Sequence, residues 1–146
     1  LLVLTEGDVI DYGAIERSIL ADCKHLDMQR ISYDRMFAGQ MTQNLAAETD
    51  VEVVPVAQTF LGLSSACKEL ERLVNGRSFR RGGHPILRRM ASNAEVKSDG
   101  LDNIRPVKPD RQRAITRIDG IQAAVTGLDG WVRRPQEADN GMVSWR

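Results

Sequence analysis

Short β-type segments alternate with longer helix-type segments along most of this chain, and this alternation constrains the fold more than any other feature of the sequence. The segment 51–56, VEVVPV, is rich in β-branched residues, which favour strands. Apolar residues then recur every three or four positions from Leu63 to Val74, the spacing of an amphipathic helix. Repeated along the chain, this pattern predicts an α/β fold in which helices flank a parallel or mixed sheet.

Capping residues set the expected limits of the helices. Asp11 is the expected N-cap of the first helix, and Ser64 or Ser65 is able to cap the helix that ends at Val74. Pro85 suits the first position of another helix, because its missing N–H has no partner there in any case. The expected elements are helices over 12–26, 63–74, 85–93 and 114–132, a further helix through Phe37, Met41 and Leu45, strands over 29–33 and 51–56, and a hairpin over 95–108 that turns at Asp99-Gly100.

Composition excludes several classes of protein. The 146 residues, 42% of them hydrophobic, suffice for one packed domain, which we expect over residues 1–132, with a polar tail over 133–146. The longest uncharged run, 53–67, is too short to span a bilayer, so no membrane partner is expected. Cys23 and Cys67 lie far apart without CxxC spacing, which favours small buried residues over a zinc site or a disulfide. The chain opens on Leu1 rather than Met, so we expect its true N-terminus to lie upstream.

Charge is distributed unevenly although the net charge is zero. Residues 1–76 hold six Lys/Arg and twelve Asp/Glu, whereas residues 77–117 hold eleven and four. A basic segment of this kind is able to bind phosphates, but it also fits a solvated face, which most charge runs are. His84, just before Pro85, is expected to be a structural or capping residue, because a lone histidine rarely carries chemistry without a partner.

Two carboxylates stand out by their positions. Asp119 lies beside the apolar stripe of the last helix, where it has to pair with a cation such as Arg113 or Arg117, or lie exposed at the helix start. Asp34 ends the strand-like run RISYD, where it either caps a helix that begins at Met36 or lies at the edge of a sheet where ligands gather. Two carboxylates at a strand end and on a late helix are one way to hold Mg²⁺ or Mn²⁺, since hard cations prefer oxygen ligands.

Several linked blocks of sequence resemble one known family. They are, in chain order, ISYDRMFAGQM, VEVVPVAQTFLGLSSACKELERLVNG, GGHPILRRMASNAEV, NIRPVKP and RIDGIQAAVTGL. Together they resemble the C-terminal nuclease domain of the large terminase subunit of tailed bacteriophages, over residues 1 to about 130. The resemblance implies a ribonuclease H-like fold, a mixed sheet flanked by helices, that lacks its leading strand or strands in this chain.

The resemblance also implies a set of site residues. Asp34 corresponds to the family's middle carboxylate and Asp119 to the carboxylate on the late helix, while the acidic residue of an upstream strand has no match here. We expect Asp34 and Asp119 to be metal ligands for Mg²⁺ or Mn²⁺, with two ions in the complete domain that activate a water and stabilise the leaving oxygen. Lys108 is expected to approach the scissile phosphate. The residues expected to bind the DNA backbone are Arg77, Arg80, Arg81, Arg88, Arg105, Lys108, Arg111 and Arg113, with at most one of Arg88 and Arg89 facing the duplex.

By this resemblance the chain is expected to be a metal-dependent endonuclease domain that cuts concatemeric viral DNA during genome packaging. Its expected partners are double-stranded viral DNA, an upstream ATPase domain of the same polypeptide, the portal protein and the small terminase subunit, in the cytoplasm of a bacterial host. No GxxxxGK[ST] loop is present, so ATP hydrolysis is not assigned to this chain. The alternative is a non-catalytic domain, or an inactive prophage remnant, that only grips DNA or docks on the portal and procapsid.

Overall fold

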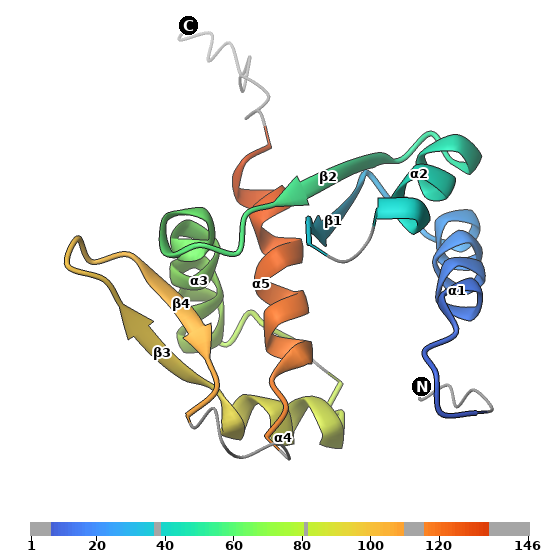
Figure 1. The fold of residues 1–146 in the computed structure, drawn as a ribbon. Coiled ribbons are helices and arrows are strands. Elements are labelled where there is room, and N and C mark those ends of the chain that lie inside the picture. The colour runs from blue at the N-terminus through green and yellow to red at the C-terminus, as the bar shows by residue number, and fades with distance from the viewer. Residues whose placement is uncertain (1–6, 37–38, 81, 110–115, 135–146) are drawn as a thin grey trace, which may run out of the picture.

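The last helix, α5 (Asp119–Val132), lies at the centre of the fold with the other elements around it (Figure 1). The structure is a computed structural model, and it describes residues 7–36, 39–80, 82–109 and 116–134. On one side of α5 lie the strands β1 (Arg30–Asp34) and β2 (Glu52–Val56), with helices α1 (Tyr12–His25) and α2 (Gly39–Glu48) beyond them. On the other side lie helix α3 (Phe60–Asn75) and the hairpin of β3 (Glu95–Ser98) and β4 (Ile104–Val107), while helix α4 (Pro85–Asn93) crosses the N-terminal end of α5.

The described strands form two separate two-stranded sheets. β1 and β2 pair in parallel, with Asp34 opposite Val56 at the end of the ladder, and β3 and β4 pair antiparallel. The predicted α/β fold with parallel and antiparallel strands is therefore confirmed, although α5 and α3 separate the two pairs of strands. Within the described ranges, no helix has the length and apolar character needed to cross a membrane.

The hydrophobic core lies where α3, α5 and the end of β2 meet. It contains Val56, Leu63, Ala66, Cys67 and Val125, and Leu70, Ile104 and Leu128 pack against it. These residues confirm the predicted apolar face of α3 from Leu63 to Leu70, whereas Val74 at the end of the predicted stripe is exposed. Burial raises the pKa of the Cys67 thiol to about 11, so Cys67 stays protonated at neutral pH and acts as the small buried residue that the sequence indicated. Cys23, in contrast, is only half-buried on α1.

One hydroxyl group inside α3 joins this helix to the hairpin. Ser64 is 5% exposed, and its Oγ accepts a hydrogen bond of 3.2 Å from the backbone N–H of Ile104 in β4. Ser64 is therefore not the N-cap of α3, and the exposed Ser65 is not either. The cap is Thr59, whose Oγ1 accepts from the N–H of Gly62 at 3.0 Å, so the helix begins at Phe60 rather than at residue 63. The cap prediction was wrong because the apolar stripe used to place the helix begins at Leu63, one turn after the helix itself begins.

The observed starts of the other helices confirm some of the predicted limits and correct others. Asp11 caps α1 as predicted, with its Oδ1 accepting from the N–H of Ala14 at 2.9 Å, and Pro85 opens α4. His84 is the N-cap residue of α4, without a side-chain cap hydrogen bond. The helix predicted from residue 114 begins at Asp119, since 116–118 are not helical and 110–115 lie outside the described residues. Phe37 and the polar tail from residue 135 also lie outside them.

The hairpin of β3 and β4 has a longer turn than the Asp-Gly pair predicted. Residues 99–103 connect the strands, and the Asp99 carboxylate accepts hydrogen bonds from the side-chain amide of Asn103 and from the backbone N–H groups of Leu101 and Asn103. These bonds, that of the Asn103 side chain first, lower the pKa of Asp99. The carboxylate thus organises the loop, and Asp102 takes a left-handed conformation with φ of 58°.

Thr59→Ala should lower the free energy of unfolding by about 1 kcal/mol, because it removes the side-chain acceptor at the start of α3. Urea denaturation followed by circular dichroism measures the loss. Ser65→Ala, at the exposed position that the sequence also offered as a cap, serves as the matched control and should change stability by less than about 0.5 kcal/mol. Equal losses in the two variants would contradict the assignment of Thr59 as the cap.

Candidate metal centre and nucleic-acid interface

Asp34 is the last residue of β1, and its side chain orients the turn that follows the strand. It is half-buried, and its Oδ1 accepts a hydrogen bond of 3.0 Å from the backbone N–H of Met36. A carboxylate that binds the N–H two residues later forms an Asx turn. Met36 lies in a turn and not in a helix, so the alternative that Asp34 caps a helix starting at Met36 is wrong. Asp34 therefore lies at the carboxyl edge of the parallel pair of strands.

Asp119 is the first residue of α5 and is exposed to solvent. Exposure at the helix start, one of the alternatives weighed from the sequence, is observed, and here the helix dipole favours a negative charge. The carboxylate is therefore not buried against the apolar stripe and carries no desolvation cost. Arg113 lies outside the described residues, and Arg117 contributes its backbone oxygen to a hydrogen bond from Asn93 of α4 at 3.2 Å.

Helix α4 fixes the first turn of α5 beside Asp119. The backbone N–H of Gly120 donates to the Sδ of Met90 at 3.1 Å, next to the bond between Asn93 and the Arg117 carbonyl. A Cβ at Gly120 would lie 2.8 Å from the Cδ1 of Leu87 and 3.0 Å from the Sδ of Met90. The missing side chain of Gly120 therefore lets α4 pack closely against the start of α5.

Gln58 joins the end of β2, the partner strand of β1, to α5, and no pattern in the sequence selected it. It follows β2, and its side-chain oxygen accepts a hydrogen bond from the side-chain amide of Gln122 on α5. Gln122 lies one helical turn after Asp119, and Val56, two residues before Gln58, pairs with Asp34. The pairing of two distant glutamines leaves no periodic signal in a single sequence.

The two carboxylates lie at different levels along α5. β1 crosses the C-terminal half of the helix, where a Cβ at Gly130 would lie 2.8 Å from the Oγ of Ser32. Asp119 lies about 16 Å before Gly130 along the helix axis, at about 1.5 Å per residue. Among the residues that the structure describes, no group of three or more His, Cys, Asp or Glu gathers as a metal site. That Asp34 and Asp119 share a metal site stays a prediction.

The basic segment separates into surface residues and one internal arginine. Arg105 of β4 donates from Nη1 to the backbone oxygen of Gln58 at 3.1 Å, and its guanidinium lies 4.5 Å from the centroid of the Phe60 ring. These contacts engage the guanidinium of the half-buried Arg105 within the protein. Arg81, Arg111 and Arg113 lie outside the described residues. The exposed members among the described residues are Arg77, Arg80, Arg88, Arg89, Lys97, Lys108 and Arg117, and Lys108 comes directly after β4.

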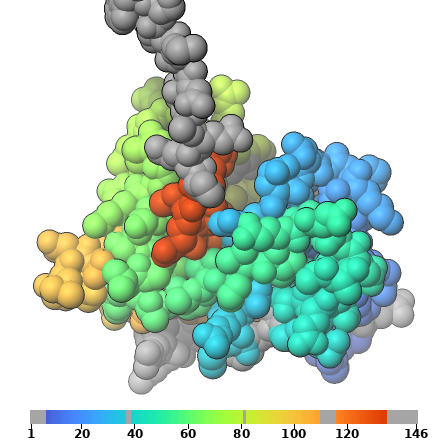
Figure 2. Space-filling view, turned by 90° about the horizontal axis from the view of Figure 1, so that it is seen from above, coloured from blue at the N-terminus to red at the C-terminus, as the bar shows by residue number. Residues whose placement is uncertain are grey.

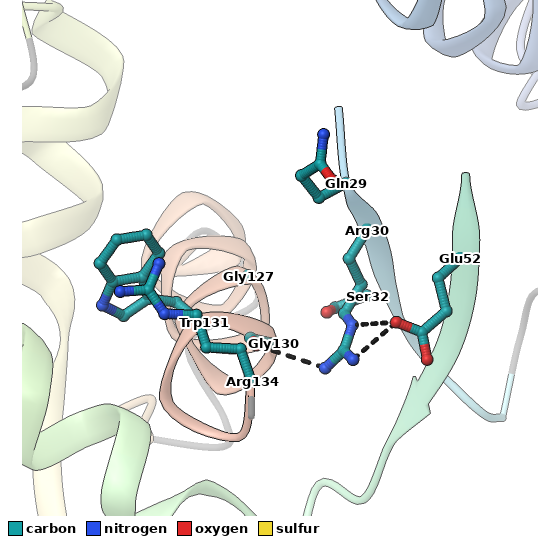
Figure 3. A pocket seen from close by; sticks show the side chains of 8 residues that line it. All are labelled: Gln29, Arg30, Ser32, Glu52, Gly127, Gly130, Trp131 and Arg134. Carbon is teal, nitrogen blue, oxygen red and sulfur yellow. Dashed lines mark hydrogen bonds and ion pairs between the residues drawn. The ribbon is translucent and has the colours of Figure 1, made fainter. Parts of the chain in front are cut away.

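A pocket opens at the other end of β1, away from Asp34 (Figure 3). It encloses about 430 Å³ between the start of β1 and the C-terminal half of α5, where Trp131 is 54% exposed. Arg30 pairs with Glu52 of β2 at 2.6 Å and donates to the backbone oxygen of Gly130 at 3.3 Å. In the view from above, the end of α5 emerges between α3 and the β1–β2 side of the molecule (Figure 2). Neither predicted metal ligand lines this pocket.

A buried carboxylate near this pocket was also missed by the sequence analysis. Asp129 of α5 is 4% exposed, and one of its oxygens pairs with the Nε of Arg133 at 2.6 Å. Arg133 also donates to the backbone oxygen of Gly62 at 3.0 Å, which ties the end of α5 to α3. The signal was present in the sequence, because an Asp and an Arg four residues apart are neighbours on a helix.

The fold is ribonuclease H-like, as the comparison with solved structures shows. The crystal structure of the HK97 bacteriophage large terminase superposes with a TM-score of 0.74 at 28% sequence identity, over 86% of this chain and 26% of that one. Residues 3–134 match the model of the family described as terminase large subunit, endonuclease domain. The chain therefore belongs to the terminase large subunit endonuclease domain family.

Two curated proteins are similar to most of the chain. The terminase large subunit of Enterobacteria phage HK97 is 31% identical over 124 residues, which are 84% of this chain and 24% of that protein. Protein YmfN of Escherichia coli (strain K12) is 29% identical over 129 residues, 88% of this chain and 28% of that protein. The chain thus spans about a quarter of the length of these relatives.

Gly120→Ala should destabilise the protein by about 1 to 3 kcal/mol, because the added Cβ forces Leu87 and Met90 of α4 to move. Gly127→Ala, in the same helix, is the matched control, since a Cβ there meets nothing within 4 Å. The control should gain up to about 1 kcal/mol from the better helix propensity of alanine. Urea denaturation of both variants measures the difference, and similar effects of the same sign would refute the close approach of α4 to α5.

Proposed function

We propose that the chain is a metal-dependent DNA endonuclease domain that cleaves concatemeric viral DNA by phosphodiester hydrolysis during genome packaging. Its membership of the terminase endonuclease family over residues 3–134 carries this proposal. The two carboxylates at the family's acidic positions support it, since Asp34 ends a parallel strand and Asp119 opens the late helix. Both are the residue types that hydrolysis of a phosphodiester by a divalent cation requires.

Asp34 and Asp119 are the residues that would hold Mg²⁺ or Mn²⁺, two ions in the complete domain. The donor set fits such an ion, because carboxylate oxygens are the hard ligands that these cations prefer. When bound, such an ion would supply activation of water for attack on phosphorus and stabilisation of charge on the leaving oxygen. The Asx turn at Asp34 orients its carboxylate, and the contacts of Gly120 and Gln122 fix the helix start at Asp119.

The exposed cations supply the grip on the duplex. Arg77 and Arg80 follow the end of α3, and Arg88 and Arg89 lie on α4, whose opposite face holds the start of α5. Contacts of this kind bind the phosphate backbone and position the duplex without reading its sequence. Lys108, exposed directly after β4, approaches the scissile phosphate in this proposal. Arg105 is assigned a structural role, because Gln58 and Phe60 already engage its guanidinium.

The partners follow from the same family assignment and are proposals as well. Since the chain spans about a quarter of its relatives' length, an upstream ATPase domain of the same polypeptide would drive translocation. Double-stranded viral DNA is the substrate, and the portal protein and the small terminase subunit are the packaging partners. The domain would act in the cytoplasm of the bacterial host.

Asp34→Asn and Asp119→Asn should each reduce Mn²⁺-dependent nicking of supercoiled plasmid by at least about a hundredfold, because an amide is a poorer metal ligand of nearly the same shape. The assay uses the natural polypeptide that carries these residues, and circular dichroism verifies that the fold is intact. Asp50→Asn is the matched control, since Asp50 is exposed just before β2, at the other end of this sheet from Asp34. Near-normal nicking by both site variants would refute the metal assignment, and a wild-type protein that binds DNA without cutting it would favour the DNA-gripping alternative.

Arg80→Glu combined with Arg88→Glu should weaken binding to double-stranded DNA and lower the magnitude of the slope of log K against log salt by about 2, near 0.9 for each lost phosphate contact. Fluorescence anisotropy with a labelled duplex over a range of salt concentrations measures both quantities. Arg17→Glu on α1 is the control, since its exposed side chain lies on a different part of the surface. An unchanged salt slope in the double variant would identify the basic segment as a solvated face.

A further inference from the structure

The amide of Gln58 uses both of its ends to connect elements on either side of the core. Its Nε2 donates to the backbone oxygen of Val56, the last residue of β2, at 3.1 Å. Its Oε1 accepts from the Nε2 of Gln122, in the second turn of α5. Because the amide is half-buried and bound at both ends, its orientation is fixed. The carboxyl edge of the β1–β2 sheet is therefore joined by one side chain to the N-terminal part of α5.

The backbone at Gln58 is itself held in place from a third direction. Its carbonyl oxygen accepts a hydrogen bond from the Nη1 of Arg105 in β4 at 3.1 Å, and the same guanidinium lies 4.5 Å from the centroid of the Phe60 ring. The Arg105 Nε is buried and has no hydrogen-bond partner among the described residues, which indicates that these contacts hold the side chain in the interior at some cost. Gln58 is thus anchored by β4 and by the start of α3.

The two residues that Gln58 bridges are each close in the chain to a proposed metal ligand. Val56 pairs with Asp34 across the parallel ladder, and Gln122 lies one turn after Asp119 on the same face of α5. The contacts of Met90 and Asn93 hold the start of α5 against α4, but they do not fix its position relative to the β1–β2 sheet. The hydrogen bonds of Gln58 connect the start of α5 to the end of β2 in that sheet.

We propose that Gln58 is a positioning residue for the metal centre: it fixes the N-terminal part of α5, and with it Asp119, relative to the edge of the sheet that carries Asp34. Gln58 acts through Gln122 and does not itself touch metal or substrate. The inference rests on the proposed function, since it concerns the geometry of the same two carboxylates. A misplaced ligand weakens metal binding more than it slows the fully loaded enzyme, so the effect should fall on metal affinity.

The test replaces Gln58 by methionine, which keeps the length of the side chain and removes both hydrogen bonds. In the natural polypeptide, Gln58→Met should raise the Mn²⁺ concentration that gives half-maximal plasmid nicking by about tenfold, while the rate at saturating Mn²⁺ changes less than threefold. Mn²⁺ binding without DNA, followed by electron paramagnetic resonance, should weaken by a similar factor. Gln29→Met is the matched control, because Gln29 is exposed at the opposite end of β1 and bonds only locally to Asp27 in the described structure.

A second variant keeps the test decisive where Gln58→Met perturbs folding. Gln122→Met removes the partner from α5 and should weaken Mn²⁺ binding by a similar factor, and the double variant should be no worse than the more impaired single variant, because all three remove the same contact. Unchanged Mn²⁺ binding in folded Gln58→Met or Gln122→Met protein, beside a wild type that binds Mn²⁺ and cuts DNA, would overturn the positioning role alone. A wild type that neither binds Mn²⁺ nor cuts DNA would overturn the proposed function together with it.

Discussion

Two glycines of α5 set how closely its neighbours approach the central helix. A Cβ at Gly130 would lie 2.8 Å from the Oγ of Ser32 and 2.9 Å from the Cδ of Arg30, and one at Gly120 would lie 2.8 Å from the Cδ1 of Leu87. Protein interiors are packed about as densely as crystals of organic molecules, so a Cβ at either position would force the side chains of β1 or α4 that it meets to move. The close packing of β1, which carries Asp34, and of α4, which lies beside Asp119, therefore depends on the absence of a methyl group at two points of α5.

The polar contacts of α5 match the polarity of the helix. At its C-terminal end, Arg30 donates to the carbonyl of Gly130, and Arg133 pairs with the buried Asp129. Cations near the last carbonyls are favourable because these groups carry partial negative charge and have no partner within the helix. At the other end Asp119 faces the partial positive charge of the first turn. The helix dipole thus favours cations at the C-terminal end of α5 and a carboxylate at its first residue.

The sequence predicted those parts of the fold that arise from local physics. The cap at Asp11, the proline that opens α4 and the apolar face of α3 were read from neighbouring residues, and the family resemblance supplied the ribonuclease H-like fold. Contacts between distant residues were not predictable in this way. The burial of Ser64 depends on the approach of β4, the internal position of Arg105 depends on Phe60, and the Gln58–Gln122 pair joins residues that no periodic pattern connects. For the candidate site, the sequence selected the two carboxylates but not the side chains that position them.

The two faces of helix α4 make different contacts, and this couples the outer surface of α4 to the position of α5. Its outer face presents Arg88 and Arg89, and its inner face binds the backbone of α5 on both sides of Asp119, through Met90 at Gly120 and Asn93 at Arg117. Because these two contacts lie on either side of Asp119, they restrict the movement of α4 relative to the start of α5. A displacement of α4, for example by a molecule that binds its outer face, would therefore also displace the Asp119 carboxylate.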